Sequence, residues 1–243
     1  MSLVSASGFI GGVKEYIYRG IQQLPIVLAA TSLLFTITTG SIAHANLAIG
    51  LIFLMPFFTW ILHLVYGLVF NKIYPGDISW TRATGESCNI IQSMEKRMNS
   101  YFDMKKSAEP IPSHWLMSLS FFIGYAISNA VDSLTAPSDP SADPINIEKR
   151  NTQAIYCIVA TSVLSLIFLG VRFRMMRGCE GRGWLGLVFS GLSAAVAGVI
   201  GWGVYNLSRK CGSRASDLFG VLSQIIPASS LSQRPIVCAE SED

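Results

Sequence analysis

The sequence predicts an all-α membrane protein, a bundle of about five transmembrane helices with an amphipathic helix in its long loop. Charged residues make up only 14% of the 243 residues and hydrophobic residues make up 51%. An average soluble domain has about 25% charged residues. The charge is missing from long blocks of about 20 apolar residues, the length that an α-helix needs to cross about 30 Å of hydrocarbon.

The first 70 residues predict a short N-terminal interfacial segment followed by a transmembrane hairpin. Residues 1–23 place hydrophobic side chains on one helical face beside Lys14, Glu15 and Arg19, which is typical of a helix at the membrane surface. Two apolar runs follow, and residues 24–70 therefore predict helices 1 and 2, joined by a turn at 43–46. Residues 43–45 also fit a leader-cleavage pattern, but such a leader would be about twice the usual length, so the first helix is expected to be retained.

Residues 71–113 form a hydrophilic loop with a helical pattern in its middle. Apolar residues recur at helical spacing over residues 84–106, with charged residues between them, which predicts an amphipathic helix. This helix can pack on the protein's own spans, or it can lie on the bilayer or bind a partner. The sequence leaves these alternatives open.

Residues 114–205 predict transmembrane helices 3 to 5, and residues 206–243 predict a soluble tail. The apolar parts of the three spans are 115–131, 154–171 and 184–205, and Arg172 is expected to mark emergence into water. With five spans, the side of the N-terminus carries twelve Lys and Arg residues and the side of the tail carries six. Because basic residues are enriched in cytoplasmic loops, the N-terminus is predicted to be cytosolic.

Small residues recur four apart within the predicted spans. Small side chains let helix backbones approach closely, and this packing holds membrane helices together. We therefore predict that these positions pack helices within the chain, although contacts between copies in an oligomer remain an alternative. Ala48 lies outside these positions and is expected to tolerate a larger side chain. The predicted helix-packing residues are Gly186, Ser190, Ala194 and Gly198 in the fifth span, and Gly124 and Ser128 in the third.

Polar side chains at membrane depth are scarce, and His63 and Asn129 are the two candidate intramembrane polar residues. Because burying such groups in a bilayer is costly, each suggests a function. One alternative is a small ion channel or transporter, similar to a viroporin. However, the repeated polar positions of a pore and the related halves of a carrier are both absent from the sequence. Satisfied helix-packing contacts are therefore the favoured interpretation.

The sequence carries no catalytic motif, and no enzyme activity, cofactor or metal site is predicted. It lacks nucleotide-binding glycine loops, nucleophile elbows, HExxH and CxxC. Its basic residues are dispersed, so no nucleic-acid partner is predicted. Free cysteines remain the default for a cytosolic protein. If a disulfide forms, the best candidates are Cys211 and Cys238, because both lie in the tail and close a short loop.

Two stretches resemble multi-pass virion membrane proteins of nucleocytoplasmic large DNA viruses, the algal and giant viruses. The first is IPSHWL, at 111–116, running into LSFFIGY and then SNA at 128–130. The second runs from the Cys-Gly pair at 211–212 through DLFG to PASSL and the PIVC ending at Cys238, with NTQA at 151–154 between the two stretches. The resemblance covers residues 111–238 and consists of aromatic, proline and cysteine positions.

This resemblance implies a structural component of the membrane beneath an icosahedral capsid. Its expected partners are the lipid bilayer and other virion or membrane proteins, including capsid components. Its expected location is the virion inner membrane and internal membranes of the host. Large DNA viruses of this kind often encode a thiol oxidase, which would favour a disulfide between Cys211 and Cys238. A cellular organelle membrane scaffold is the other interpretation of the same sequence features.

Overall fold

The computed structural model describes residues 3–73, 111–135, 144–175, 183–210 and Leu218. These residues are helical except for short connections and Leu218, which confirms the all-α class for the described part of the chain. The predicted amphipathic helix at 84–106 lies outside these residues. So do Cys211 and Cys238, the candidate disulfide pair.

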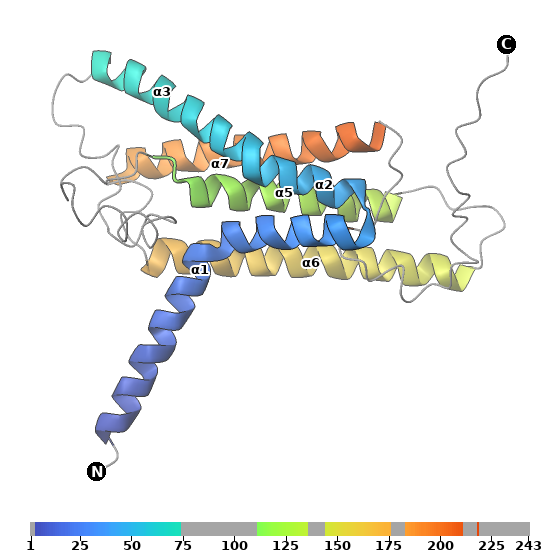
Figure 1. The fold of residues 1–243 in the computed structure, drawn as a ribbon, viewed down its shortest axis with the longest axis horizontal. Helices are drawn as coiled ribbons and strands as arrows, with labels where there is room; N and C mark the ends of the chain where they lie inside the picture. Colours follow the sequence, from blue (N-terminus) through green and yellow to red (C-terminus); the bar gives the residue numbers. More distant parts are fainter. Residues whose placement is uncertain (1–2, 74–110, 136–143, 176–182, 211–217, 219–243) are drawn as a thin grey trace.

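Helix α1 (Leu3–Thr39) is a single helix, so the boundary predicted at residue 23 falls inside it. Figure 1 shows that its N-terminal part projects away from the other helices, whereas the rest lies along them. Pro25 lies inside the helix. Proline has no N–H to bond the carbonyl four residues earlier, and it often bends a helix.

The turn between the first two helices lies at Gly40 and Ser41, because α1 ends at Thr39 and α2 (Ile42–Ile49) begins one residue after Ser41. The turn predicted at 43–46 is therefore wrong, since those residues belong to α2. Gly40 has a φ of 64°, a left-handed conformation that favours glycine, and its N–H donates to the Thr36 carbonyl. This is a common way to end a helix. In the sequence, Gly40 followed by Ser41 is the pattern that indicates the turn.

Helix α2 continues through a π-helical turn, η1 (Gly50–Leu54), into α3 (Met55–Ile73). The Met55 N–H bonds to the Gly50 carbonyl, five residues earlier. Pro56 follows directly and has no N–H to continue the helical hydrogen bonds. The wide turn therefore lies where the regular hydrogen-bond pattern is interrupted. Gly50 also faces the ring of Phe121, where a Cβ atom would overlap that ring.

Three further helices complete the bundle: α5 (His114–Thr135), α6 (Pro144–Met175) and α7 (Gly183–Lys210). Figure 1 shows that they run back and forth alongside the second part of α1 and α2. We call the end where α5 and α7 finish and α6 begins the tail-side end; the turn between α1 and α2 is also there. The opposite end, where α3 finishes and α5 begins, is the loop-side end.

Helix α5 is the core of the bundle. It packs most extensively against α7 and α6 and also touches α1, α3 and η1. Thirteen of its 22 residues are buried, including Trp115, Phe121 and Tyr125 with no exposed surface. A helix covered by other helices can carry polar residues, since partners rather than lipid surround them. This burial accounts for the polar residues Asn129 and Asp132 within α5.

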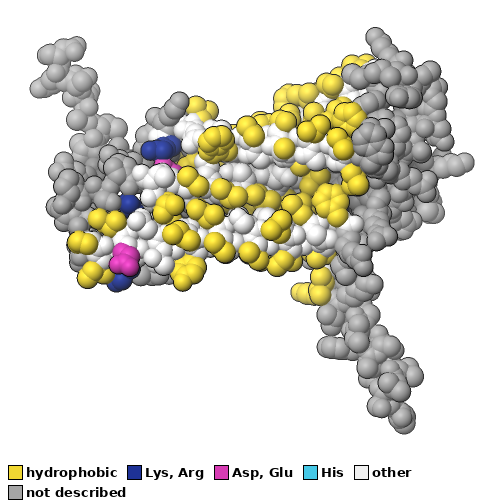
Figure 2. Space-filling view, turned by 180° about the vertical axis from the view of Figure 1, so that it is seen from behind, with side chains coloured by type: hydrophobic (Ala, Val, Ile, Leu, Met, Phe, Trp, Pro, Cys, Tyr) yellow, Lys and Arg dark blue, Asp and Glu magenta, His cyan; other side chains and the backbone are white. Residues whose placement is uncertain are grey.

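Among the described residues, four helical segments are long and apolar enough to cross a membrane: Gly20–Thr39, Ile42–Leu68, Ile147–Phe173 and Gly186–Arg209. Most of their side chains are not buried inside the protein. Figure 2 shows hydrophobic side chains along the described part of one face, with charged side chains gathered near one end of the helices. This distribution is compatible with lipid around the middle of the bundle. The predicted count of about five spans would need α5 to cross as well.

Helices α5 and α7 pack backbone to backbone through glycine. A Cβ atom on Gly124 would overlap the Gly198 carbonyl, and one on Gly201 would overlap the Phe121 carbonyl. The predicted packing positions Gly124 and Gly198 therefore meet within one chain. Ala48 is only 2% exposed, however, so the expectation that this position tolerates a larger side chain is not supported.

Candidate functional site

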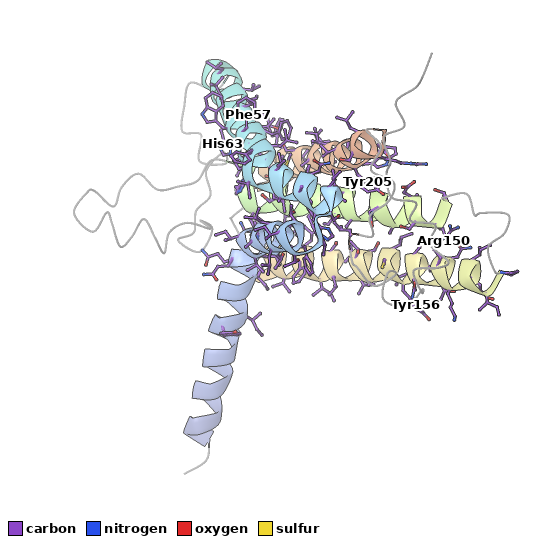
Figure 3. All side chains as sticks on the ribbon, turned by 45° about the vertical axis from the view of Figure 1, so that its right-hand side comes forward. Phe57, His63, Arg150, Tyr156 and Tyr205 are labelled. Carbon is purple, nitrogen blue, oxygen red and sulfur yellow. The ribbon has the colours of Figure 1, made fainter. Side chains whose placement is uncertain are left out.

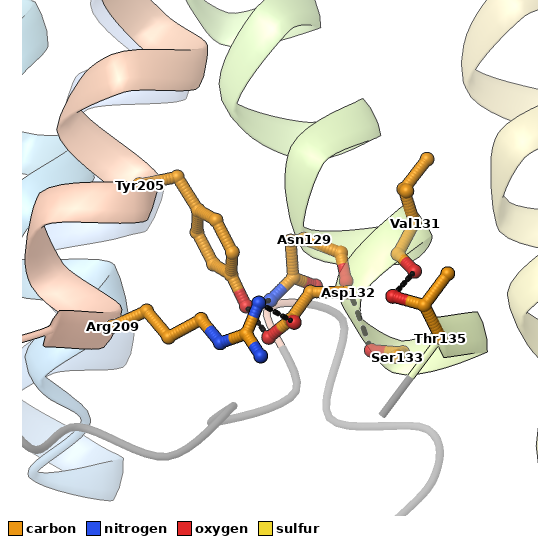
Figure 4. A network of polar contacts seen from close by, with 7 residues as sticks. All are labelled: Asn129, Val131, Asp132, Ser133, Thr135, Tyr205 and Arg209. Carbon is orange, nitrogen blue, oxygen red and sulfur yellow. Dashed lines mark hydrogen bonds and ion pairs between the residues drawn. The ribbon is translucent and has the colours of Figure 1, made fainter. Parts of the chain in front are cut away.

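A buried polar network joins α5 to α7 at the tail-side end (Figure 4). Asn129 and Asp132 lie three residues apart on α5, and Tyr205 and Arg209 lie four apart on α7, so each pair shares one helix face. The Asn129 Nδ2 donates to the Tyr205 Oη at 3.2 Å, and that hydroxyl donates to Asp132 Oδ2 at 3.0 Å. The four side chains thus form one continuous chain of polar contacts.

Asp132 is the buried charge of this network, and Arg209 neutralises it. Asp132 is 6% exposed, and its Oδ1 lies 2.6 Å from the Arg209 Nη1, whose side chain is 51% exposed. A buried carboxylate is costly unless it is paired and hydrogen-bonded. Here one oxygen meets the guanidinium and the other accepts from Tyr205. Arg209 can reach Asp132 from α7 while remaining in contact with the aqueous edge.

A second set of polar contacts ties the α1–α2 turn to the same end. The Tyr125 hydroxyl donates to the Ala43 carbonyl at 2.7 Å, and Asn46 Nδ2 donates to the Ser208 Oγ at 2.6 Å. The Tyr125 and Tyr205 rings meet edge to face, with centroids 5.3 Å apart. Hydrogen bonds and ring contacts therefore hold helices α2, α5 and α7 together.

The two predicted intramembrane polar residues lie at opposite ends of the bundle. The Nε2 of His63 bonds to the carbonyl of Pro112, just before α5, whereas Asn129 lies in the tail-side network. Asn129 lies seventeen positions after Pro112 in the sequence. At about 1.5 Å per helical residue, this is about 25 Å. Figure 3 shows His63 on α3 far from Tyr205 of that network. The structure does not bring His63 and Asn129 together.

Three of the six predicted helix-packing residues are buried in the bundle, and two others meet across α5 and α7. Gly124 and Gly198 meet directly, and Ser190, Gly186 and Ser128 are buried. Ala194 is half-buried and packs against a cluster that contains Trp115. Gly191, the next residue in the sequence to Ser190, has no atom within 4 Å of its Cβ position.

A further cluster at the loop-side end was not predicted from the sequence. Pro25 leaves the Ile21 carbonyl without its helical donor, and the Trp115 indole Nε1 donates to that carbonyl at 2.6 Å. Arg172 lies over the Trp115 ring at 4.8 Å, a cation–π contact. Arg172 has no exposed surface, so the expectation that it marks emergence into water is wrong. The position of Pro25 identifies Ile21 as the free carbonyl, but nothing local identifies Trp115 as its donor.

The side chains of the tail-side network hold α5 and α7 together. Among the described residues, no group of three or more His, Cys, Asp or Glu side chains is placed to hold a metal ion. Within that part of the chain, Cys157 on α6 forms no disulfide. The hydroxyl, amide and carboxylate groups of the tail-side network contact one another across helices.

The fold and this network are those of an all-helical protein with four membrane-length apolar helices, which is compatible with a multi-pass integral membrane protein. No protein-family model, no curated protein and no solved structure matches the chain. The residues of the chain and their contacts are therefore the basis for its function.

Proposed function

We propose that this chain is a non-enzymatic structural protein of a membrane, which organises or anchors other proteins through residues 71–113 and the tail. The observation that carries the proposal is that the buried polar side chains bond to one another across helices. Asp132, Asn129 and Tyr205 bond to one another across α5 and α7, and Arg209 closes the group. Groups arranged in this way hold helices in fixed positions.

We include α5 as a fifth span. It lies between helices that are themselves long enough to cross, and it runs from the loop-side end to the tail-side end with 22 residues. At about 1.5 Å per residue it is about 33 Å long, which matches the hydrocarbon core. Five spans put the N-terminus and the tail on opposite sides, with the N-terminus in the cytosol by its basic loops.

The setting that we propose is the internal membrane of a large DNA virus, in the virion and in host internal membranes. The support is the resemblance of residues 111–238 to virion membrane proteins of the algal and giant viruses. In such a membrane, capsid components are the partners that the loop and the tail would contact. A cellular organelle scaffold would share the same bundle.

Two measurements test the structural role. Cross-linking and mass spectrometry of purified particles should find the chain in the membrane fraction, cross-linked to capsid components through residues 71–113 or the tail. Absence from particles and presence in an organelle membrane would contradict the viral setting. In proteoliposomes, ion flux should equal that of empty liposomes. Flux that is lost in His63→Gln, which removes a titratable side chain, would establish a channel instead and overturn the structural role.

A further inference from the structure

One residue of the tail, Leu218, lies against the bundle at the tail-side end. Leu218 lies eight residues beyond Lys210, the last residue of α7, yet its side chain is only 7% exposed. It belongs to the main hydrophobic cluster, together with Leu47, Leu51 and Tyr205. One leucine of the tail is therefore inserted into the core of the bundle.

Both backbone groups of Leu218 are held by side chains of the bundle. Its carbonyl oxygen accepts a hydrogen bond from the His44 Nε2 at 2.6 Å, and its N–H donates to Asn129 Oδ1 at 3.4 Å. His44 comes from α2 and Asn129 from α5, and they are 5% and 1% exposed. Peptide-binding sites similarly combine backbone hydrogen bonds with a pocket for a side chain.

The residues that hold Leu218 are oriented by contacts within the bundle itself. The Asn129 amide nitrogen donates to the Tyr205 hydroxyl, which leaves Oδ1 for the Leu218 N–H. The His44 ring lies 5.4 Å from the Phe35 ring, and its Nε2 must carry the hydrogen because a carbonyl only accepts. The helices therefore supply an oriented acceptor, an oriented donor and an apolar pocket.

We propose that the tail-side end is a docking site for a short peptide segment centred on one aliphatic residue, and that its resident occupant is the chain's own tail at Leu218. Docking holds the tail to the bundle at Leu218. This inference rests on the proposed function only where it concerns partners, because that function has the tail bind other proteins. A partner that binds the tail would then be linked, through the docked Leu218, to helices α2 and α5.

Limited trypsin digestion of the purified full chain tests the docking. Beyond the Lys210–Cys211 bond at the end of α7, the tail has one trypsin-sensitive bond, Arg214–Ala215, because Arg234 is followed by Pro235. Docking four residues later should slow this cleavage. Leu218→Ala and His44→Ala should therefore release fragment 215–243 about tenfold faster, since burial of one leucine shifts an opening equilibrium by that factor or more. Leu207→Ala, at a 63% exposed position on α7, is the matched control and should not change the rate.

Three results would overturn the inference. The first is an unchanged release rate in both Leu218→Ala and His44→Ala. The second is cleavage at Arg150, inside α6, that accelerates in the same proportion, because the variants would then loosen the bundle rather than undock the tail. The third is a release rate that rises on dilution of the unaltered chain, because the occupant would then be the tail of a second copy. The assay uses no partner, so its outcome is independent of whether the chain organises capsid proteins.

Discussion

The close contact between α5 and α7 makes Gly201→Ala a strong perturbation. The added Cβ would overlap the Phe121 carbonyl oxygen and would lie 3.0 Å from the Phe121 carbonyl carbon and 3.1 Å from the Tyr125 backbone nitrogen. All three atoms belong to the α5 backbone, which cannot rotate away as a flexible side chain can. The two helices would have to separate, so the contacts around Phe121 and Tyr125 would be lost.

The expected cost follows from overpacking. Inserting an extra carbon into a well-packed core typically costs about 1–3 kcal/mol. Alanine also has a higher helix propensity than glycine, by up to about 1 kcal/mol, which acts in the opposite direction. Gly203→Ala is the control, because it gains the same helix propensity as Gly201→Ala and the difference between the two variants leaves only the overpacking. Gly203 lies on the same helix, and nothing lies within 4 Å of its Cβ position.

The assay is thermal unfolding in detergent, followed by intrinsic tryptophan fluorescence. We expect Gly201→Ala to be less stable than Gly203→Ala by about 1–3 kcal/mol. At roughly 2–4 °C per kcal/mol for a chain of this size, the two midpoints should differ by several degrees. Equal midpoints would refute the backbone-to-backbone contact between α5 and α7.

Three further predictions address the two ends of the bundle and the tail. Tyr205→Phe should lower stability by about 1–3 kcal/mol in detergent, because it leaves two buried polar partners without their shared hydroxyl. Trp115→Phe should increase the mobility of a spin label at residue 16, because the donor that holds the α1 bend is lost. If the tail cysteines are oxidised, peptide mapping without reductant should find Cys211 linked to Cys238, and a bridge over this loop of about 27 residues should stabilise the tail by about 3 kcal/mol.

Each of these predictions has a control or a contradicting result. Tyr156→Phe is the control for the tyrosine variant, since Tyr156 is 69% exposed on α6, and an equal effect of the two would contradict the network. Trp202→Phe, at a 55% exposed position, should leave the label unaffected. A peptide that links Cys88 to Cys211 would contradict the five-span topology, because those residues are predicted on opposite sides of the membrane.

The extent of α7 was predictable because a long apolar block determines it locally. The fifth span was predicted at 184–205, and α7 covers 183–210. The turn at Gly40 was missed because the hydropathy of the block continues on both sides of it. There the decisive signal is one glycine with a left-handed conformation.

The candidate site was predicted only in part. Asn129 was identified because an amide at membrane depth needs a partner, but Tyr205, 76 residues away, was not identified as that partner. The role of Leu218 was not predicted, because Phe219, Val221 and Leu222 are apolar as well and nothing local distinguishes Leu218 from them. Arg172 was misplaced because a window of hydropathy cannot show that Trp115 covers it. Such pairings depend on how separate helices come together, which no local pattern encodes.

The central claim is a five-span bundle whose loop-side and tail-side ends lie on opposite sides of a membrane. Two single-cysteine variants test it, one that retains Cys88 in the 71–113 loop and one that retains Cys238 in the tail, labelled in sealed vesicles with a membrane-impermeant maleimide. We predict that one variant is labelled in intact vesicles and the other only after permeabilisation. Equal labelling of both in intact vesicles would show that the two segments share one side, and the five-span bundle would be wrong.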